Sequence, residues 1–201
     1  MKKTLLAISS VILSAMMSLP VLAQTTGSIR IAAHRGFWKC DETKHAENSI
    51  ASLKTAQENN FWGSEFDIHI TADDQIVVHH DDYIQGQLIW TNTFDSLLKY
   101  KLNNGETMPT LDAYLSQGEL YPETMLVLEF KSQQNEEREN KMVDMTFDKL
   151  KAHGLYDPSR VMFISFSMNV CKMVAKVAPE CTSRDLRGDS APSELHKLGI
   201  N

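Results

Sequence analysis

The chain has 201 residues, with 20 lysine and arginine side chains, 26 aspartate and glutamate side chains and a formal net charge of −6 at neutral pH. This length suits one domain with a sizeable hydrophobic core. The acidic balance argues against nucleic acid as the main partner, because no basic field is available to neutralise a phosphate backbone, whereas a small phosphate ester needs only a local cationic site.

The first 23 residues have the pattern of a secretory signal peptide. Two lysines precede an apolar run over residues 5–22, and a small-residue cleavage pattern ends at Ala23. We therefore expect export, to the periplasm or out of the cell, and a domain over residues 24–201 whose formal charge is −8 once the two lysines are removed. The alternative is a membrane anchor, but the run is near the lower length limit for a span and holds Pro20 near its end. We expect no stable membrane span elsewhere.

Three cysteines, Cys40, Cys171 and Cys181, would meet the oxidising conditions of an exported protein. An odd number cannot pair fully within one chain, and the sequence leaves open whether Cys171 and Cys181 form a disulfide. Their spacings do not resemble those of a zinc site.

Short apolar strands alternate with longer helical patterns after the signal peptide. Asn48 or Ser49 can cap the first helix, and Gly154 follows a long helix as a C-cap residue. In chain order, we expect a strand over 29–33, a helix over 48–60, strands over 64–71 and 75–79, helices over 94–100 and 110–117, a strand over 125–131, a helix over 134–153, a strand over 160–165, a helix over 168–177, a short strand over 182–186 and a helix over 192–198.

The repeated order of strand and helix predicts an α/β fold with a parallel sheet and helices outside it. Glu65, Asp67 and His69 share one face of their strand, whereas an open sheet covered by helices on both faces would need apolar residues on both. Charged side chains on one face near strand ends favour a TIM-type barrel. Because a complete barrel usually needs about 250 residues, we expect the barrel domain over 24–201 to be incomplete at its C-terminal end, without its last strands.

Side chains suited to catalysis follow the predicted strands. His34 and Arg35 come directly after the first strand, where a histidine can transfer protons and a guanidinium suits a phosphate. Gly36 then allows a tight backbone turn. His80 follows a later strand, and Lys131 ends another. Chance explains one such strand well and several poorly.

Three carboxylates add a candidate metal site. Glu65 and Asp67 point the same way on one strand, and two anions side by side repel unless a cation lies between them. Glu129 lies on a later strand. Hard divalent ions such as Mg²⁺ or Ca²⁺ take oxygen ligands, so such an ion fits this set. For Glu65 and Asp67 alone, a solvated edge strand is the alternative.

Together these residues suit a phosphodiester. The ion and Arg35, with Lys131 helping, would draw charge from the non-bridging oxygens. One of the two histidines, His34 and His80, would take a proton from the attacking hydroxyl, and the other would give a proton to the leaving alcohol. Lys131 has an alternative role as an ion-pair partner of Glu129.

Seven motifs follow one another in a fixed order, and together they carry a resemblance. They are His34-Arg35-Gly36, Glu47-Asn48-Ser49, Glu65-Phe66-Asp67, Thr71 with Asp73, Val77 to Asp81, Pro109-Thr110-Leu111, and Leu128 to Lys131. No single tripeptide is specific, but the ordered set is. Over residues 29–167 the sequence resembles the glycerophosphodiester phosphodiesterases.

The resemblance implies a TIM-type barrel that hydrolyses glycerophosphodiesters to sn-glycerol 3-phosphate and an alcohol. It also implies that the glycerol's own neighbouring hydroxyl attacks first and gives a cyclic phosphate that water then opens. The implied roles are Ca²⁺ or Mg²⁺ binding by Glu65, Asp67 and Glu129, acid and base catalysis by His34 and His80, and phosphate binding by Arg35.

Some features depart from the family pattern. Ala46 stands where the family usually has proline, and His79 lies next to His80, although only His80 precedes the expected aspartate. The family's last strands have no counterpart after Leu198. Two alternatives therefore stay open, a related phospholipase C or D and a truncated, non-catalytic remnant. An unclosed sheet also exposes strand edges, which makes a homo-oligomer a further expectation to test.

Overall fold

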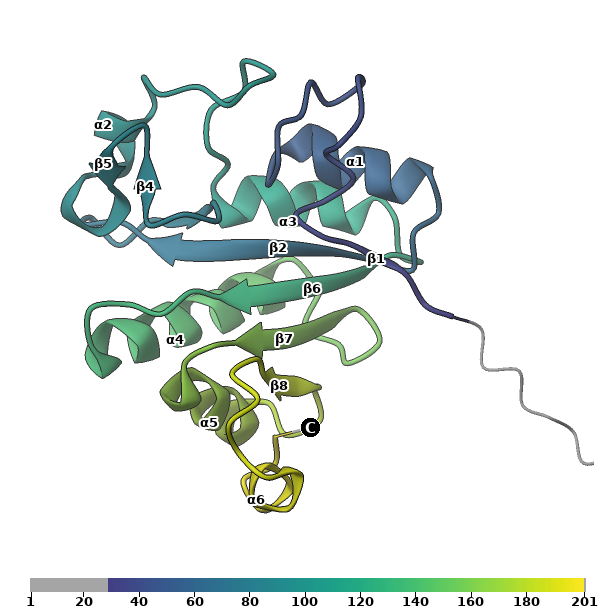
Figure 1. Ribbon diagram of the computed structural model, residues 1–201, viewed down its shortest axis with the longest axis vertical. Coiled ribbons are helices and arrows are strands. Elements are labelled where there is room, and N and C mark those ends of the chain that lie inside the picture. The colour runs from purple at the N-terminus through teal and green to yellow at the C-terminus, as the bar shows by residue number, and fades with distance from the viewer. Residues whose placement is uncertain (1–28, 201) are drawn as a thin grey trace, which may run out of the picture.

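The computed structural model describes residues 29–200 (Figure 1). The predicted signal peptide over residues 1–23 lies outside the described residues. Within 29–200, no helix has the length and apolarity needed to cross a bilayer.

A mostly parallel sheet forms the centre of the molecule. Its strands follow the order β1-β2-β6-β7-β8, and β3 pairs with β2 off this path. A separate two-stranded hairpin is formed by β4 and β5. The bounds are β1 Ala32–Ala33, β2 Gly63–Ile70, β3 Ile76–Val78, β4 Tyr83–Ile84, β5 Gln87–Leu88, β6 Met125–Phe130, β7 Val161–Ser165 and β8 Ser183–Asp185.

The helices that flank the sheet begin where a polar side chain caps free backbone N–H groups. Ser49, Thr110, Asn135 and Ser167 each accept a hydrogen bond from the first turn of the helix that follows. The bounds are α1 Ile50–Glu58, α2 Phe94–Leu97, α3 Leu111–Glu119, α4 Glu136–Ala152, α5 Met168–Val177 and α6 Pro192–Lys197, with a 3₁₀ turn η1 at Ile89–Thr91.

The hydrophobic core lies between one face of the sheet and helices α1, α3, α4 and α5. Alternate residues of β2 and β6, such as Phe66 and Leu128, point into this core and are fully buried. The rings of Phe66 and Tyr114 of α3 pack with centroids 4.4 Å apart. Because side chains alternate along a strand, the charged residues between these positions lie on the opposite face, which is the inner face of a barrel.

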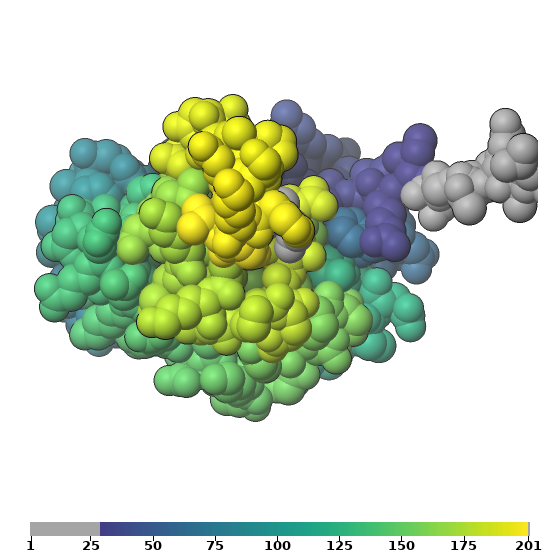
Figure 2. All heavy atoms as spheres, turned by 90° about the horizontal axis from the view of Figure 1, so that it is seen from below, coloured from purple at the N-terminus to yellow at the C-terminus, as the bar shows by residue number. Residues whose placement is uncertain are grey.

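The α/β fold of a TIM-type barrel is confirmed, and the sheet is not closed within the described residues. β1 and β8 are the two ends of the strand order, and no described strand joins them. On β7 the core-facing residues are buried, whereas Met162 and Ile164 on the inner face are only half-buried. Seen from the β8 end, the segments after β7 face the viewer in yellow and yellow-green (Figure 2).

The strand predicted over 75–79 is present as β3, but it runs antiparallel in a sheet that was predicted to be parallel. β3 pairs antiparallel with β2, with Ile70 opposite Ile76. The turn between them is tight, with Thr71 and Gln75 hydrogen-bonded to each other and Asp74 at a positive φ of 64°. So short a connection permits only a hairpin, because parallel strands need a long crossover. The small hairpin β4–β5 was not predicted, since each of its strands has only two residues.

Cys40, Cys171 and Cys181 are all free in the described structure. Cys171 and Cys181 are buried, and burial raises the pKa of each thiol to about 11. The disulfide that the sequence left open between these two is therefore not formed.

Candidate active site

The pairing of β2 with β6 assembles the carboxylates. Asp67 lies directly opposite Glu129 in the parallel register, and Glu65 lies two residues earlier on the same face. One carboxylate oxygen from each residue lies within 4.8 Å of the others, and all three residues are buried. The structure thus brings together the three predicted metal ligands.

The electrostatics of this triad call for a cation. Burial, followed by the charge of Asp67, raises the pKa of Glu65 to about 8, and burial also raises the pKa of Glu129. Glu65 Oε1 and Asp67 Oδ1 are buried and accept no hydrogen bond from the described residues. A donor set made only of oxygens, two of them without partners, fits a hard divalent ion.

Lys131 supplies the positive charge nearest to the triad in the described structure. Its Nζ donates to Glu129 Oε1 at 2.9 Å and lies 3.5 Å from Asp67 Oδ1. Burial acts to lower the pKa of Lys131, but the hydrogen bond to Glu129 and the charge of Asp67 outweigh it and raise that pKa. The ion pair with Glu129 that the sequence offered as an alternative role is present.

The loop after β1 carries His34, Arg35 and Gly36. Arg35 has a positive φ of 57°, and its backbone N–H donates to Glu65 Oε2 at 2.8 Å. Its Nη1 donates to both carboxylate oxygens of Glu47, at 3.0 and 2.9 Å, while its Nε is buried without a described partner. His34 Nε2 lies 3.8 Å from Glu65 Oε2, and its side chain is 70% exposed. Burial of part of the ring and the charge of Arg35 lower the pKa of His34.

Gly36 allows this loop to lie against helix α1. Its φ is +75°, and a Cβ built at this position would lie 2.7 Å from the backbone carbonyl carbon of Ser52. We therefore expect Gly36→Ala to lower the free energy of unfolding by about 2 kcal/mol or more, because a strained φ and a backbone clash combine. Denaturant unfolding measures the change. Gly105→Ala is the matched control, since Gly105 has a φ of +89° and no atom within 4 Å of its Cβ position. An equal loss in both variants would contradict the role of the clash.

The hairpin β2–β3 brings His80 back beside the triad, because His79 N–H donates to the carbonyl of Asp67. His80 Nδ1 donates to Asp81 Oδ1 at 2.6 Å, which leaves Nε2 free to exchange a proton. His79 Nε2 instead donates to the backbone carbonyl of Tyr83 at 3.1 Å. This geometry favours His80 over its neighbour as the catalytic candidate.

Comparison with known proteins decides the family. The sequence profile of the glycerophosphoryl diester phosphodiesterase family matches residues 34–197. The chain belongs to this family of enzymes.

Solved structures agree with that assignment. A glycerophosphodiester phosphodiesterase from Parabacteroides distasonis is 38% identical, with a TM-score of 0.81 over 85% of this chain and 70% of that one. Two others share the fold. One is a phosphodiesterase from Oleispira antarctica in complex with the product sn-glycerol-3-phosphate, with 23% identity, a TM-score of 0.71 and coverage of 86% and 72%. The other is a putative glycerophosphodiester phosphodiesterase from Galdieria sulphuraria, with 20% identity, a TM-score of 0.73 and the same coverage. Among curated proteins, no sequence matches this chain.

Asn48 also contributes to the site of this phosphodiesterase, although from the sequence it was expected only as a possible helix cap and as part of the Glu47-Asn48-Ser49 motif. Ser49 caps α1, whereas buried Asn48 donates from Nδ2 to Asp67 Oδ2 at 2.8 Å and accepts from the backbone N–H of Asp67 at 3.2 Å. Its φ is +53°, a conformation that asparagine tolerates better than most residues. Asn48 thereby fixes one carboxylate oxygen of Asp67 and leaves the other facing the site.

His69 is a second residue of the site to which the sequence assigned no role. It lies on the same strand face as Glu65 and Asp67. It is fully buried, and its Nε2 lies 3.3 Å from the backbone oxygen of His80. A carbonyl oxygen only accepts, so Nε2 carries the hydrogen. Burial lowers the pKa of His69 to about 4, so the ring is neutral near pH 7. His69 therefore holds the backbone of His80 in position through this hydrogen bond.

We expect His69→Leu to lower kcat about tenfold with little change in KM, because loss of the hydrogen bond lets His80 shift. His69→Gln retains an N–H donor and should recover most of the rate. Steady-state kinetics of both variants, together with their thermal unfolding, separates a loss of His80 positioning from a loss of stability. Equal kcat values for the leucine and glutamine variants would rule out the proposed positioning of His80.

Proposed function

We propose that the chain hydrolyses glycerophosphodiesters to sn-glycerol 3-phosphate and an alcohol, with the help of a divalent cation. The observation that carries the proposal is the buried triad of Glu65, Asp67 and Glu129 beside His80, in a member of the glycerophosphoryl diester phosphodiesterase family. The product named in the Oleispira antarctica complex supports the same reaction.

The triad would hold one Ca²⁺ or Mg²⁺ ion, because all its donors are oxygens. When bound, such an ion supplies positive charge that draws electron density from the phosphate oxygens. Asn48 occupies Asp67 Oδ2, so Oδ1, which lies 3.5 Å from Lys131 Nζ, is the oxygen that faces the site. Loss of any one carboxylate is therefore expected to weaken ion binding.

Two cations of the chain would bind the phosphate. Glu47 holds the Arg35 guanidinium through Nη1 and Nε is buried, so Nη2 is the nitrogen that stays available for phosphate oxygens. Lys131 lies at the edge of the triad with its side chain 17% exposed. Both positive charges stabilise the charge that develops on the phosphate during attack.

The two histidines would exchange the protons. Asp81 holds His80 through Nδ1, so Nε2 is the atom that gives or takes a proton. His34 Nε2 lies 3.8 Å from Glu65 Oε2, and its ring is exposed, so a substrate can reach it. One histidine takes the proton of the attacking hydroxyl, which the neighbouring hydroxyl of the glycerol moiety would supply, and the other protonates the leaving alcohol. Water then opens the cyclic phosphate. In this step the two histidines exchange their roles as acid and base.

We further propose that the enzyme is exported to the periplasm or out of the cell after cleavage behind Ala23. The basic start and apolar run support this location. N-terminal sequencing of the protein recovered from the periplasm or the medium tests it. A mature N-terminus other than one close to Gln24, or retention of the whole chain in membranes, would exclude the proposed processing.

The activity test uses purified chain with Ca²⁺ or Mg²⁺ and soluble glycerophosphodiesters, with enzymatic detection of sn-glycerol 3-phosphate. Release of product that EDTA abolishes is expected. Absence of product with either ion would favour a non-catalytic remnant of the fold. Faster cleavage of phospholipid vesicles than of soluble diesters would favour a phospholipase. Sedimentation of the same sample shows whether the open edges at β1 and β8 lead to a homo-oligomer.

A further inference from the structure

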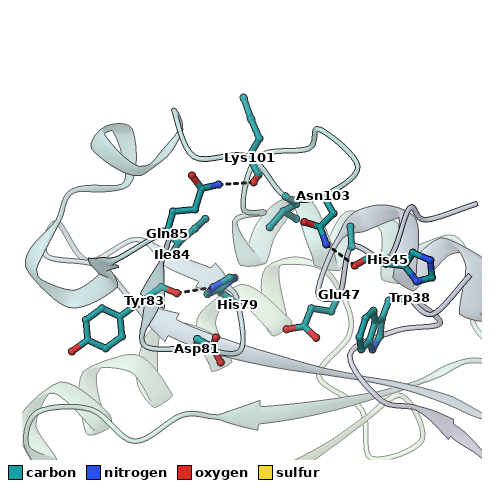
Figure 3. Close-up of a pocket in the computed structure, with 12 residues that line it drawn as sticks. Trp38, His45, Glu47, His79, Asp81, Tyr83, Ile84, Gln85, Lys101 and Asn103 are labelled. Atoms are coloured by element: carbon teal, nitrogen blue, oxygen red, sulfur yellow. Dashed lines mark hydrogen bonds between the residues drawn. The ribbon is translucent and has the colours of Figure 1, made fainter. Parts of the chain in front are cut away.

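A cavity of about 320 Å³ adjoins the site and is lined in part by His79 and Asp81, the two sequence neighbours of His80 (Figure 3). Its walls come from the loop between β1 and α1, the β4–β5 hairpin and the segment 101–103. The cavity meets the catalytic residues at two carboxylates, since Glu47 accepts from Arg35 and Asp81 accepts from His80. A volume at the small end of the range for ligand pockets suits a short substituent of a phosphate held at the site.

Three polar side chains of the cavity wall already use a hydrogen-bond donor within the protein. The side chains of His79, Gln85 and Asn103 each donate to a backbone carbonyl oxygen, at 3.1, 3.0 and 3.1 Å, as the dashed lines in Figure 3 show. The amide oxygens of Gln85 and Asn103 and the Oδ2 of Asp81 accept no hydrogen bond from the described residues. The side chains of Gln85, Asn103 and Asp81 therefore offer free acceptor oxygens to a ligand.

The charged side chains around the cavity also favour a ligand that donates hydrogen bonds and carries a positive charge. Glu47 and Asp81 are the carboxylates of the wall, and the side chain of Lys101 points away from the other lining side chains in Figure 3. The carboxylate of Asp81 has one oxygen free beyond its hydrogen bond to His80. A cation that carries N–H groups gains both charge attraction and hydrogen bonds here.

An aromatic cage for a quaternary ammonium is not built in this cavity. Lys39 Nζ already lies 5.1 Å from the centroid of the Trp38 ring, so a cation occupies one of its faces. The ring of Tyr83 points away from the other lining side chains in Figure 3. A quaternary ammonium also has no N–H to give to the free acceptors, so the wall favours a primary ammonium.

We propose that this cavity binds the alcohol moiety of the substrate and selects alcohols that carry a primary ammonium group, such as ethanolamine. The inference rests on the proposed hydrolysis of glycerophosphodiesters and adds the class of the leaving alcohol. A neutral polyol gains hydrogen bonds but no charge attraction, and an alcohol with a carboxylate meets Asp81 and Glu47 with repulsion.

The first experiment compares kcat/KM for glycerophosphodiesters of ethanolamine, choline, glycerol and serine, all of which release the same glycerol phosphate. We expect the ethanolamine diester to exceed the glycerol and choline diesters about fivefold, the effect of one charge pair near water. Equal values for all four diesters would overturn the selectivity and leave the proposed function intact. Hydrolysis of none of them would overturn the proposed function itself.

The second experiment places a positive charge in the wall. Gln85→Lys and Asn103→Lys should each lower the ratio of kcat/KM for the ethanolamine diester to kcat/KM for the glycerol diester about fivefold, because the added charge repels only the ammonium. Gln87→Lys is the matched control, because Gln87 lies in the same hairpin and does not line the cavity. An unchanged ratio in both cavity variants would overturn the proposal. Faster turnover of phosphatidylethanolamine vesicles than of the soluble diester would also overturn it, since the proposed ligand is the soluble ester.

Discussion

Replacing His80 by alanine is expected to lower kcat about 10²–10⁴-fold, the usual contribution of a positioned general acid or base. The imidazole is partly exposed and its only described side-chain partner is Asp81, so its removal leaves no buried group unpaired. The fold should therefore persist. His34→Ala is expected to lower kcat by a similar factor, because the reaction needs both a general base and a general acid.

Single-turnover and steady-state assays of both variants, with circular dichroism for the fold, measure these effects. His196→Ala is the matched control, since His196 is exposed in α6. If His80→Ala or His34→Ala retains a rate near that of the unmodified enzyme, the acid and base assignment is wrong. If both are inactive but unfolded, His80→Gln and His34→Gln, which retain size and polarity, decide between structural and chemical loss.

Glu65→Gln is expected to stabilise the ion-free protein and to weaken its stabilisation by Ca²⁺ or Mg²⁺. Native Glu65 keeps its proton up to a pKa of about 8, compared with 4.5 for an unperturbed glutamate. The unfolded chain therefore loses this proton earlier, and the stability of the ion-free protein falls as pH rises from about 4.5 to about 8. Glutamine does not ionise, so the variant should lack that fall, a difference on the order of 2–4 kcal/mol at pH 8.

Thermal unfolding in EDTA across pH 5–9, followed by addition of Ca²⁺ or Mg²⁺, tests this expectation. Glu123→Gln is the control, because Glu123 is exposed and outside the triad. The difference between the stability of Glu65→Gln and that of the unmodified chain should be small at pH 5, rise up to about pH 8 and level off above it. A stability of the unmodified, ion-free chain that rises over this interval would contradict the raised pKa of Glu65. Equal stabilisation of the variant by the ion would remove Glu65 from the ligands.

Local patterns predicted much of the fold. The alternation of charged and apolar residues correctly placed Glu65 and Asp67 on the face opposite Phe66, and the long helical pattern matches α4. The sheet was predicted to be parallel, whereas β3 pairs antiparallel with β2 across the short turn between Thr71 and Gln75.

The candidate site was predicted less completely than the fold, for a physical reason. The triad could be gathered from strand ends, but the contacts of Asn48 with Asp67 and of His69 with the backbone of His80 join segments whose distance only the folded chain sets. A buried histidine and an asparagine at positive φ carry no local pattern that names a partner. The cavity wall depends likewise on a hairpin too short to predict.

The register between β2 and β6 has a consequence for folding. Glu65 and Asp67 belong to one strand and Glu129 to another, far away in the sequence, so the three carboxylates meet only after these strands have paired. A slip of one residue would turn Glu129 towards the helices and bury it among apolar groups. An ion that needs all three ligands would thus bind no earlier than this long-range step. The rate at which a refolding sample acquires ion binding would therefore report when β2 and β6 reach their native alignment.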